Sequence, residues 1–117
     1  RPGDWYLADL PEGYAEVARE AGAALTVVTY ENSRGDWIDL TYRPMVQGAL
    51  IDIDRENMEI SEITVLGMSA QLYLSTEENG INAIILFDET NNLSFVISTR
   101  EDSATLISMA ESLNTAE

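Results

Sequence analysis

The chain has 117 residues, close to the commonest size of one domain, so we expect a single domain over residues 1–117. With 45% hydrophobic residues it can bury a core. It contains no His, Cys or Lys. This composition excludes Ser-His-Asp triads, thiolate catalysis and zinc sites built on cysteine. We therefore expect that the protein is not an enzyme and needs no cofactor.

The charge is strongly acidic, with 21 Asp and Glu against 6 Arg and a net charge of −15. Residues 1–47 carry eight acids and four Arg, whereas residues 48–117 carry thirteen acids and two Arg. Such a field repels phosphate, so we expect no binding to nucleic acid and no direct binding to membranes. Solubility is the ordinary role of this acidity; a basic partner surface or a divalent cation is the alternative. The second half is where a cationic partner is expected.

The N-terminal region offers one aromatic anchor and one ambiguous segment. Trp5 and Tyr6 are expected to fasten the terminus to the core rather than to form a binding platform. Residues 13–24 contain good helix formers, but Gly22 and the flanking turns also permit a strand-turn-strand structure. The neighbouring hairpin pattern favours strand at this position.

Short β-type runs separated by turn residues follow from about residue 23. Alternation predicts that Ile38, Leu40 and Tyr42 share the buried face of one of these strands. Asn79-Gly80 predicts a hairpin with a tight turn. The run 83–87 is apolar on both faces, which is typical of a central, covered strand. The expected strands lie at 25–30, 37–42, 49–53, 59–65, 69–76, 81–87 and 93–97.

The C-terminal segment has helical periodicity. Leu106, Met109, Ala110 and Leu113 fall on one face and predict an amphipathic helix from about 101 to 114, with Thr99 followed by Asp102 as a capping arrangement. This helix is expected to cover the sheet. The fold class is therefore α+β: a curved antiparallel sheet of about six to eight strands with a C-terminal α-helix packed on one face.

Two groups of residues are candidate ligand sites. Asp52, Asp54 and Glu56 have the spacing of a calcium loop, but Asn57 and Ile63 stand where that motif needs Gly and a bidentate Glu. A solvated turn is the favoured interpretation, and a surface calcium site is the alternative. The second group is a set of tyrosines, which serve either packing or a possible ligand groove. Its members are Tyr30, Tyr42 and Tyr73.

The tripeptide Arg34-Gly35-Asp36 matches the cell-adhesion motif, but it stands where a hairpin needs a polar turn containing glycine. We therefore expect this segment to be a turn.

Several short segments, together spanning about residues 7 to 114, resemble a known family. They are Leu10-Pro11-Glu12-Gly13-Tyr14, Tyr30, the strand with Ile38, Leu40 and Tyr42, residues 63–70, 84–87 and 93–97, and the helix with Leu106, Ala110 and Leu113. The chain thereby resembles the bacterial family catalogued as domain of unknown function 4367. Phe87 departs from the Trp that such domains often carry in the central strand. The resemblance also favours strand for residues 13–19.

The resemblance implies a location and offers no activity. Such domains usually follow a transmembrane helix in Gram-positive gut and soil bacteria, outside the cytoplasmic membrane, and some occur in proteins similar to anti-sigma or sporulation-type regulators. The family has no established activity and no catalytic residues to transfer. The chain begins at Arg1-Pro2 without Met. We therefore expect an extracytoplasmic domain excised from a longer, membrane-anchored protein.

The expected function is non-catalytic sensing or protein interaction. Its working surface would be a sheet edge or the acidic region 52–62. The alternative is a carrier or receptor for a small apolar ligand held between sheet and helix, supported by a fold-level analogy to periplasmic sensors and lipoprotein carriers.

Overall fold

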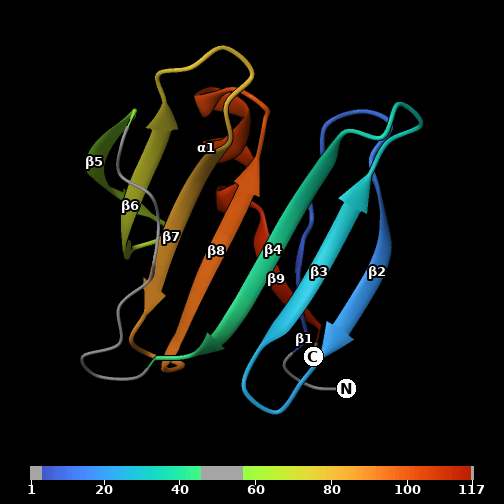
Figure 1. The fold of residues 1–117 in the computed structure, drawn as a ribbon. Coiled ribbons are helices and arrows are strands. Elements are labelled where there is room, and N and C mark those ends of the chain that lie inside the picture. Colours follow the sequence, from blue (N-terminus) through green and yellow to red (C-terminus); the bar gives the residue numbers. More distant parts are fainter. Residues whose placement is uncertain (1–3, 46–56, 117) are drawn as a thin grey trace.

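The computed structural model of the protein describes residues 4–45 and 57–116. These residues form one open antiparallel sheet and a second layer on one of its faces (Figure 1). The elements are β1 (Asp4–Leu7), β2 (Ala15–Ala21), β3 (Thr26–Glu31), β4 (Trp37–Pro44), β5 (Met58–Val65), β6 (Met68–Ser75), β7 (Asn82–Asp88), β8 (Leu93–Thr99), α1 (Ser103–Glu111) and β9 (Leu113–Ala116).

The main sheet has seven strands in the order β2-β3-β4-β8-β7-β6-β5, and every neighbouring pair is antiparallel. It consists of two meanders, β2–β4 and β5–β8, which meet where β8 lies beside β4. The α+β fold class is confirmed, and the segment 13–24 contains a strand, β2. The strand expected at 49–53 lies outside the described residues.

The second layer has two parts, both on the same face of the sheet. In Figure 1 this face points away from the viewer, with α1 behind β7 and β8 and the β1–β9 ribbon behind β4 and β3. Trp5 of β1 packs edge-on against Phe95 of β8, with ring centroids 4.8 Å apart, so the expected anchoring role of Trp5 is confirmed. The opposite face is called the open face below, because neither α1 nor the ribbon covers it.

Side chains along each strand point alternately to the two faces of the sheet, and those that face the second layer form the core. Val28, Leu40, Ile97, Ile84 and Leu72 form one row across five strands, and all five are buried beneath α1 and the ribbon. Each such side chain stabilises the fold by roughly 1.5–3 kcal/mol.

The central strand β7 is buried on both faces, as its apolar run predicted. Ile84 and Leu86 face the second layer, whereas Ala83 and Ile85 pack with Tyr73 on the opposite side.

The helix is shorter than predicted. Asp102 caps it by accepting a hydrogen bond from Thr105 N at 2.9 Å, which lowers the pKa of the Asp102 carboxyl. The helix ends at Glu111, and Leu113 pairs with Leu7 in the ribbon. The assignment of Leu113 to the helix was therefore wrong: its apolar side chain is buried by strand pairing instead. Periodicity alone does not distinguish these two ways of burying one leucine.

A tight two-residue turn lies between β5 and β6, one hairpin earlier than the sequence predicts. Leu66 and Gly67 connect β5 to β6 with φ angles of 54° and 77°, the positive pair of a type I′ turn. The tight turn expected at Asn79-Gly80 is wrong, because β6 ends at Ser75 and β7 begins only at Asn82.

Two features explain the longer loop between β6 and β7. The Asn82 side chain accepts a hydrogen bond from Ser75 N at 2.8 Å and so ends the ladder early. Glycine is needed at position 80 because a Cβ there would overlap the Ser75 side chain.

Candidate functional site

The structure separates the predicted site residues. Asp52, Asp54 and Glu56 lie outside the described residues, so the calcium prediction stays a prediction. Within residues 4–45 and 57–116, no group of three or more acidic side chains could hold a metal ion.

The Arg34-Gly35-Asp36 segment forms a turn, as expected. The Asn32 side chain accepts hydrogen bonds from the backbone N–H groups of Arg34 and Asp36, and Gly35 has a φ of 85°. Hydrogen bonds from the side chains of Asn32 and Arg34 lower the pKa of Asp36. The polar groups of this turn are used to hold its own shape.

The three tyrosines do not line one groove. Tyr30 and Tyr42 lie beneath the ribbon, where their hydroxyls accept hydrogen bonds from Leu7 N at 3.0 Å and Trp5 N at 3.3 Å. Both therefore satisfy backbone donors of β1, and burial raises the pKa of Tyr30. Tyr73 lies on the open face and donates its hydroxyl proton to Gln71 Oε1 at 2.8 Å.

The β2 edge of the sheet is irregular and fastened to the ribbon. Its pairing with β3 shifts register between Glu16 and Ala18, which marks a β-bulge. Arg19 binds both carboxylate oxygens of Glu16 and donates to Trp5 O at 3.1 Å. The hydrogen bond with Glu16 raises the pKa of Arg19. A bulge and inward-tied charges are the devices by which edge strands avoid pairing with other chains.

A cleft of about 410 Å³ lies where the loops at one end of the sheet converge. In it the Arg100 guanidinium lies 5.9 Å from the centroid of Trp37 and donates to Asn79 O at 2.7 Å. Tyr14 donates to Glu101 at 2.7 Å; burial and this hydrogen bond raise the pKa of Tyr14. The polar groups of this Trp37 cleft thus bind one another, and they tie the loops together.

The β5 edge, at the other end of the sheet, is regular. Eight consecutive residue pairs join β5 to β6 with no register shift, and no strand among the described residues pairs with the outer side of β5. A two-residue type I′ turn closes on a hydrogen-bonded pair, here Val65 and Met68. Hydrogen-bonded and non-hydrogen-bonded pairs alternate along an antiparallel ladder. The backbone N–H and C=O groups of Ile60, Glu62 and Thr64 therefore point outward, away from β6.

Two large apolar side chains stand exposed on the β5–β6 hairpin. Ile60 on β5 is 42% exposed and Leu66 at the turn is 54% exposed. Leu66 also holds a left-handed backbone conformation that costs a leucine about 1–2 kcal/mol. An apolar, strained residue at a tip is a feature that functional surfaces retain.

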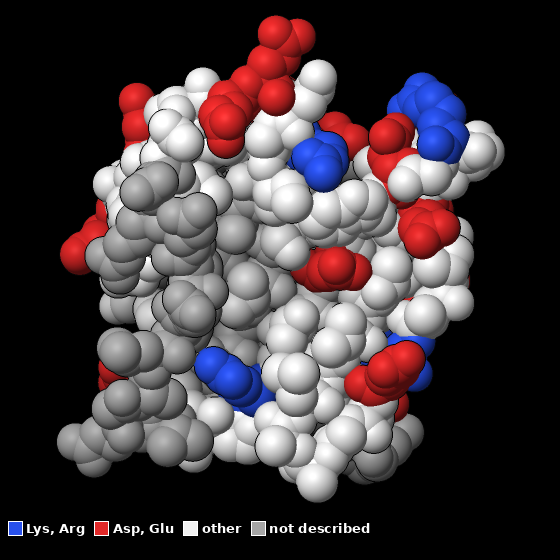
Figure 2. Space-filling view, viewed as in Figure 1, with Lys and Arg blue, Asp and Glu red and all other residues white. Residues whose placement is uncertain are grey.

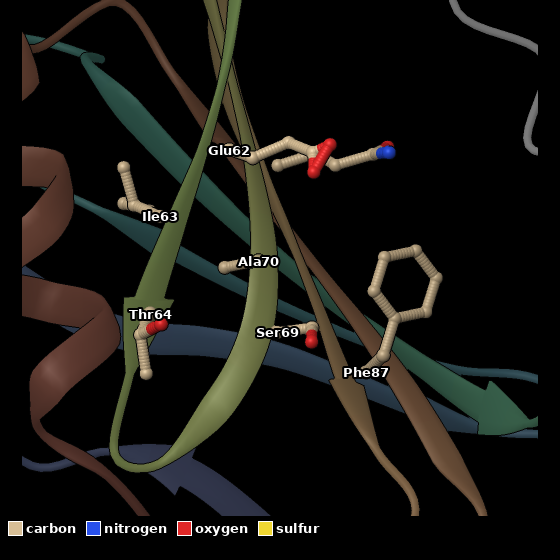
Figure 3. Close-up of a pocket in the computed structure, with 7 residues that line it drawn as sticks. Glu62, Ile63, Thr64, Ser69, Ala70 and Phe87 are labelled. Carbon is tan, nitrogen blue, oxygen red and sulfur yellow. The ribbon is translucent and has the colours of Figure 1, made fainter.

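A groove of about 270 Å³ adjoins this edge (Figure 3). The side chains of Glu62, Ser69 and Phe87 point to the same side of the sheet, away from Ile63 and Ala70, which point toward α1. Register places Gln71 directly opposite Glu62, and Ser69 between Thr64 and Phe87. The groove below the β5 edge therefore has a carboxylate, an amide and an aromatic ring on the open face. We call it the Glu62 groove; its lining residues are Glu62, Ile63, Thr64, Ser69, Ala70, Gln71 and Phe87.

Among residues 57–99, which include the strands that form the Glu62 groove, all charged side chains have one sign. Residues 57–99 include six acids and no Arg or Lys. Figure 2 shows described acidic atoms, and no described basic ones, along the margin on the β5 side, at the left of the view. No hydrogen bond or ion pair joins the Glu62 side chain to another described residue.

The sequence predicts a sheet edge or the region 52–62 as the working surface, and β5 includes residues 58–62 of that region. Ser69, Gln71 and Phe87 were not among the predicted site residues. A signal was present: polar Ser69 and Gln71 alternate with apolar Ala70 and Leu72, which predicts a polar row on one face of β6.

The fold and site define a two-layer α+β domain with one blocked and one regular sheet edge. Residues 7–113 match the family described as domain of unknown function (DUF4367), and the chain belongs to this family. No curated protein and no solved structure matches the chain. None of the helices in the described ranges has the length and hydropathy needed to span a membrane.

Proposed function

We propose that this domain is a non-catalytic protein-interaction module, which binds an extended segment of a partner protein along β5. The observation that carries the proposal is the regular, outward-facing edge of β5. The module belongs to the extracytoplasmic part of a membrane-anchored protein, where the bound segment reports the presence of the partner.

Backbone geometry supports strand addition at this edge. The outward N–H and C=O groups of Ile60, Glu62 and Thr64 recur at every second residue, the spacing at which an added strand forms its ladder. Main-chain hydrogen bonds supply affinity in this mode, and pockets for alternate side chains supply specificity. The β2 edge offers no equivalent because its bulge interrupts the register and Arg19 ties it to the ribbon.

Packing between sheet and helix favours the interaction function over an apolar-ligand carrier. Leu106, Met109 and Ala110 of α1 are buried against the sheet, where they meet Ile84 and Leu86 in one cluster. A carrier needs a cavity at this interface, whereas these side chains fill it.

Two substitutions at one position test strand addition. The probe is an acetylated, amidated eight-residue peptide in which Val alternates with Gln, titrated calorimetrically against the 117-residue chain. Ile60→Pro removes a backbone N–H that points away from β6 and leaves the hydrogen bonds between β5 and β6 in place. Edge strands tolerate proline at such positions. We expect about tenfold weaker binding, since about 1.4 kcal/mol corresponds to a factor of ten.

Ile60→Val is the matched control, because it retains the N–H and the β-branched shape. It should bind like the wild type, and melting curves should show that both variants fold. Equal affinity of Ile60→Pro and Ile60→Val, or no binding by the wild type, would contradict strand addition at β5.

The location is tested on the full-length protein. Reporter fusions at the C-terminus of the domain, active only on one side of the membrane, should give signal on the outer side. Signal from the cytoplasmic reporter alone would contradict an extracytoplasmic module.

A further inference from the structure

We infer that the Glu62 groove receives a Lys or Arg side chain of the bound segment, so that the partner is a basic extended strand. This inference rests on the proposed function and adds the chemistry of the partner and the side chain that recognises it.

Register brings the incoming side chain to the groove. Glu62 directs both its backbone groups to the outer edge and its side chain to the open face. A strand added to β5 therefore places one residue directly opposite Glu62, with Cβ atoms roughly 4.5–5.5 Å apart. That side chain extends over the same face as Ser69 and Phe87.

The groove offers each part of a long cationic side chain a suitable contact. The Glu62 carboxylate accepts hydrogen bonds from an ammonium or guanidinium group. The aliphatic stem passes over the exposed Ile60 side chain, which lies on the same face of β5 two residues from Glu62. At about 270 Å³ the groove is smaller than the roughly 300–1,000 Å³ of most small-molecule sites, which favours a single side chain as occupant.

The Trp37 cleft provides an internal comparison. There the chain itself supplies the cation, Arg100, above an aromatic ring in a cleft that Glu101 also lines. The Glu62 groove has the ring and the carboxylate, but residues 57–99 supply no cation. Charge complementarity across the acidic β5 margin therefore selects a basic partner.

Three peptides test the chemistry. Each has eight residues in which Val alternates with Lys, with Gln or with Glu, so that only the charge on one face differs. We expect the Lys peptide to bind about fivefold more tightly than the Gln peptide, since one exposed ion pair contributes about 1 kcal/mol at most. The Glu peptide should bind most weakly.

Three variants separate the groove from the general field of a chain with net charge −15. The Lys preference should disappear in Glu62→Gln and persist in Phe87→Leu, because Phe87 lies on β7, two strands inside β5. It should persist in Glu59→Gln, which removes the same charge from the other face of β5. Melting temperatures should show that each variant folds.

The outcomes distinguish this inference from the proposed function. Equal affinity for the Lys and Gln peptides would overturn the basic partner and leave strand addition intact. A Lys preference that is unchanged in Glu62→Gln would also overturn the inference, because the attraction would then be non-specific. Absence of binding by all three peptides would overturn strand addition itself.

Discussion

The two halves of the sheet are covered and terminated in opposite ways. The β2–β4 half lies under the β1–β9 ribbon, whose backbone N–H groups donate hydrogen bonds to two buried tyrosine hydroxyls and which accepts one from Arg19. The β5–β8 half lies under α1, which is held by apolar packing. The first half ends in a bulged, tied edge, and the second ends in a regular edge with which no described strand pairs. The polar groups of the first edge are thus used within the fold, whereas the outward backbone groups of β5 have no partner strand among the described residues.

The largest expected effect concerns the β5–β8 half of the sheet, which apolar packing joins to α1. Leu106→Ala should lower the free energy of unfolding by about 2–5 kcal/mol, because Leu106 is fully buried between α1 and the sheet. Urea denaturation measures the change. Ser108→Ala, on the exposed side of the same helix, is the control and should change stability by less than about 0.5 kcal/mol. Similar losses in both variants would contradict a core organised around α1.

The second prediction concerns the β2–β4 half of the sheet, which hydrogen bonds join to the β1–β9 ribbon. Tyr30→Phe leaves the buried Leu7 N–H without its acceptor and should cost about 1–3 kcal/mol. Tyr73→Phe removes a hydroxyl bonded only to the Gln71 side chain and should cost less. Denaturation of both variants decides the order. A larger loss for Tyr73→Phe would show that the ribbon is not held by this hydrogen bond.

The third prediction concerns the strained tip of the open edge. Leu66→Asn should raise the free energy of unfolding by about 1 kcal/mol, because Asn tolerates the left-handed conformation that Leu66 adopts. Leu66→Ala shortens the side chain without relieving the backbone, so its stability should stay near that of the wild type. A gain for Ala equal to that for Asn would indicate that exposure, not backbone conformation, sets the cost.

The smallest effect is a dependence on pH. Burial and the hydrogen bond with Glu101 raise the pKa of Tyr14 in the folded protein. The contribution of Tyr14 to the free energy of unfolding is therefore complete below its ordinary pKa, about 10. This contribution is lost as the pH rises through the raised pKa of the folded protein. Tyr14→Phe should reduce the loss of stability between pH 8 and pH 11, measured by thermal melting. An unchanged alkaline slope would contradict this role.

Much of the fold could be predicted from residue patterns. Strict alternation at Ile38, Leu40 and Tyr42 specified which face is buried, and the apolar run of β7 indicated a central strand. The ribbon could not be predicted, because β1 and β9 have only four residues each and pair across nearly the whole chain. Local periodicity contains no information about such distant partners.

The candidate site could be predicted only in part. An acidic edge region was expected, but the groove needs Glu62, Ser69 and Phe87 from three strands, and their proximity depends on register. The tyrosine group failed as a groove for the same reason. Tyr73 lies in a different register row and on the opposite face from Tyr30 and Tyr42.

Residue-resolved amide exchange with the Lys-Val peptide shows which edge of the sheet the bound strand occupies. We expect slower exchange for the outward amides of Ile60, Glu62 and Thr64 when the peptide binds, and unchanged exchange along β2. Protection along β2 instead, or peptide binding without protection of these three amides, would contradict the assignment of β5 as the interaction edge.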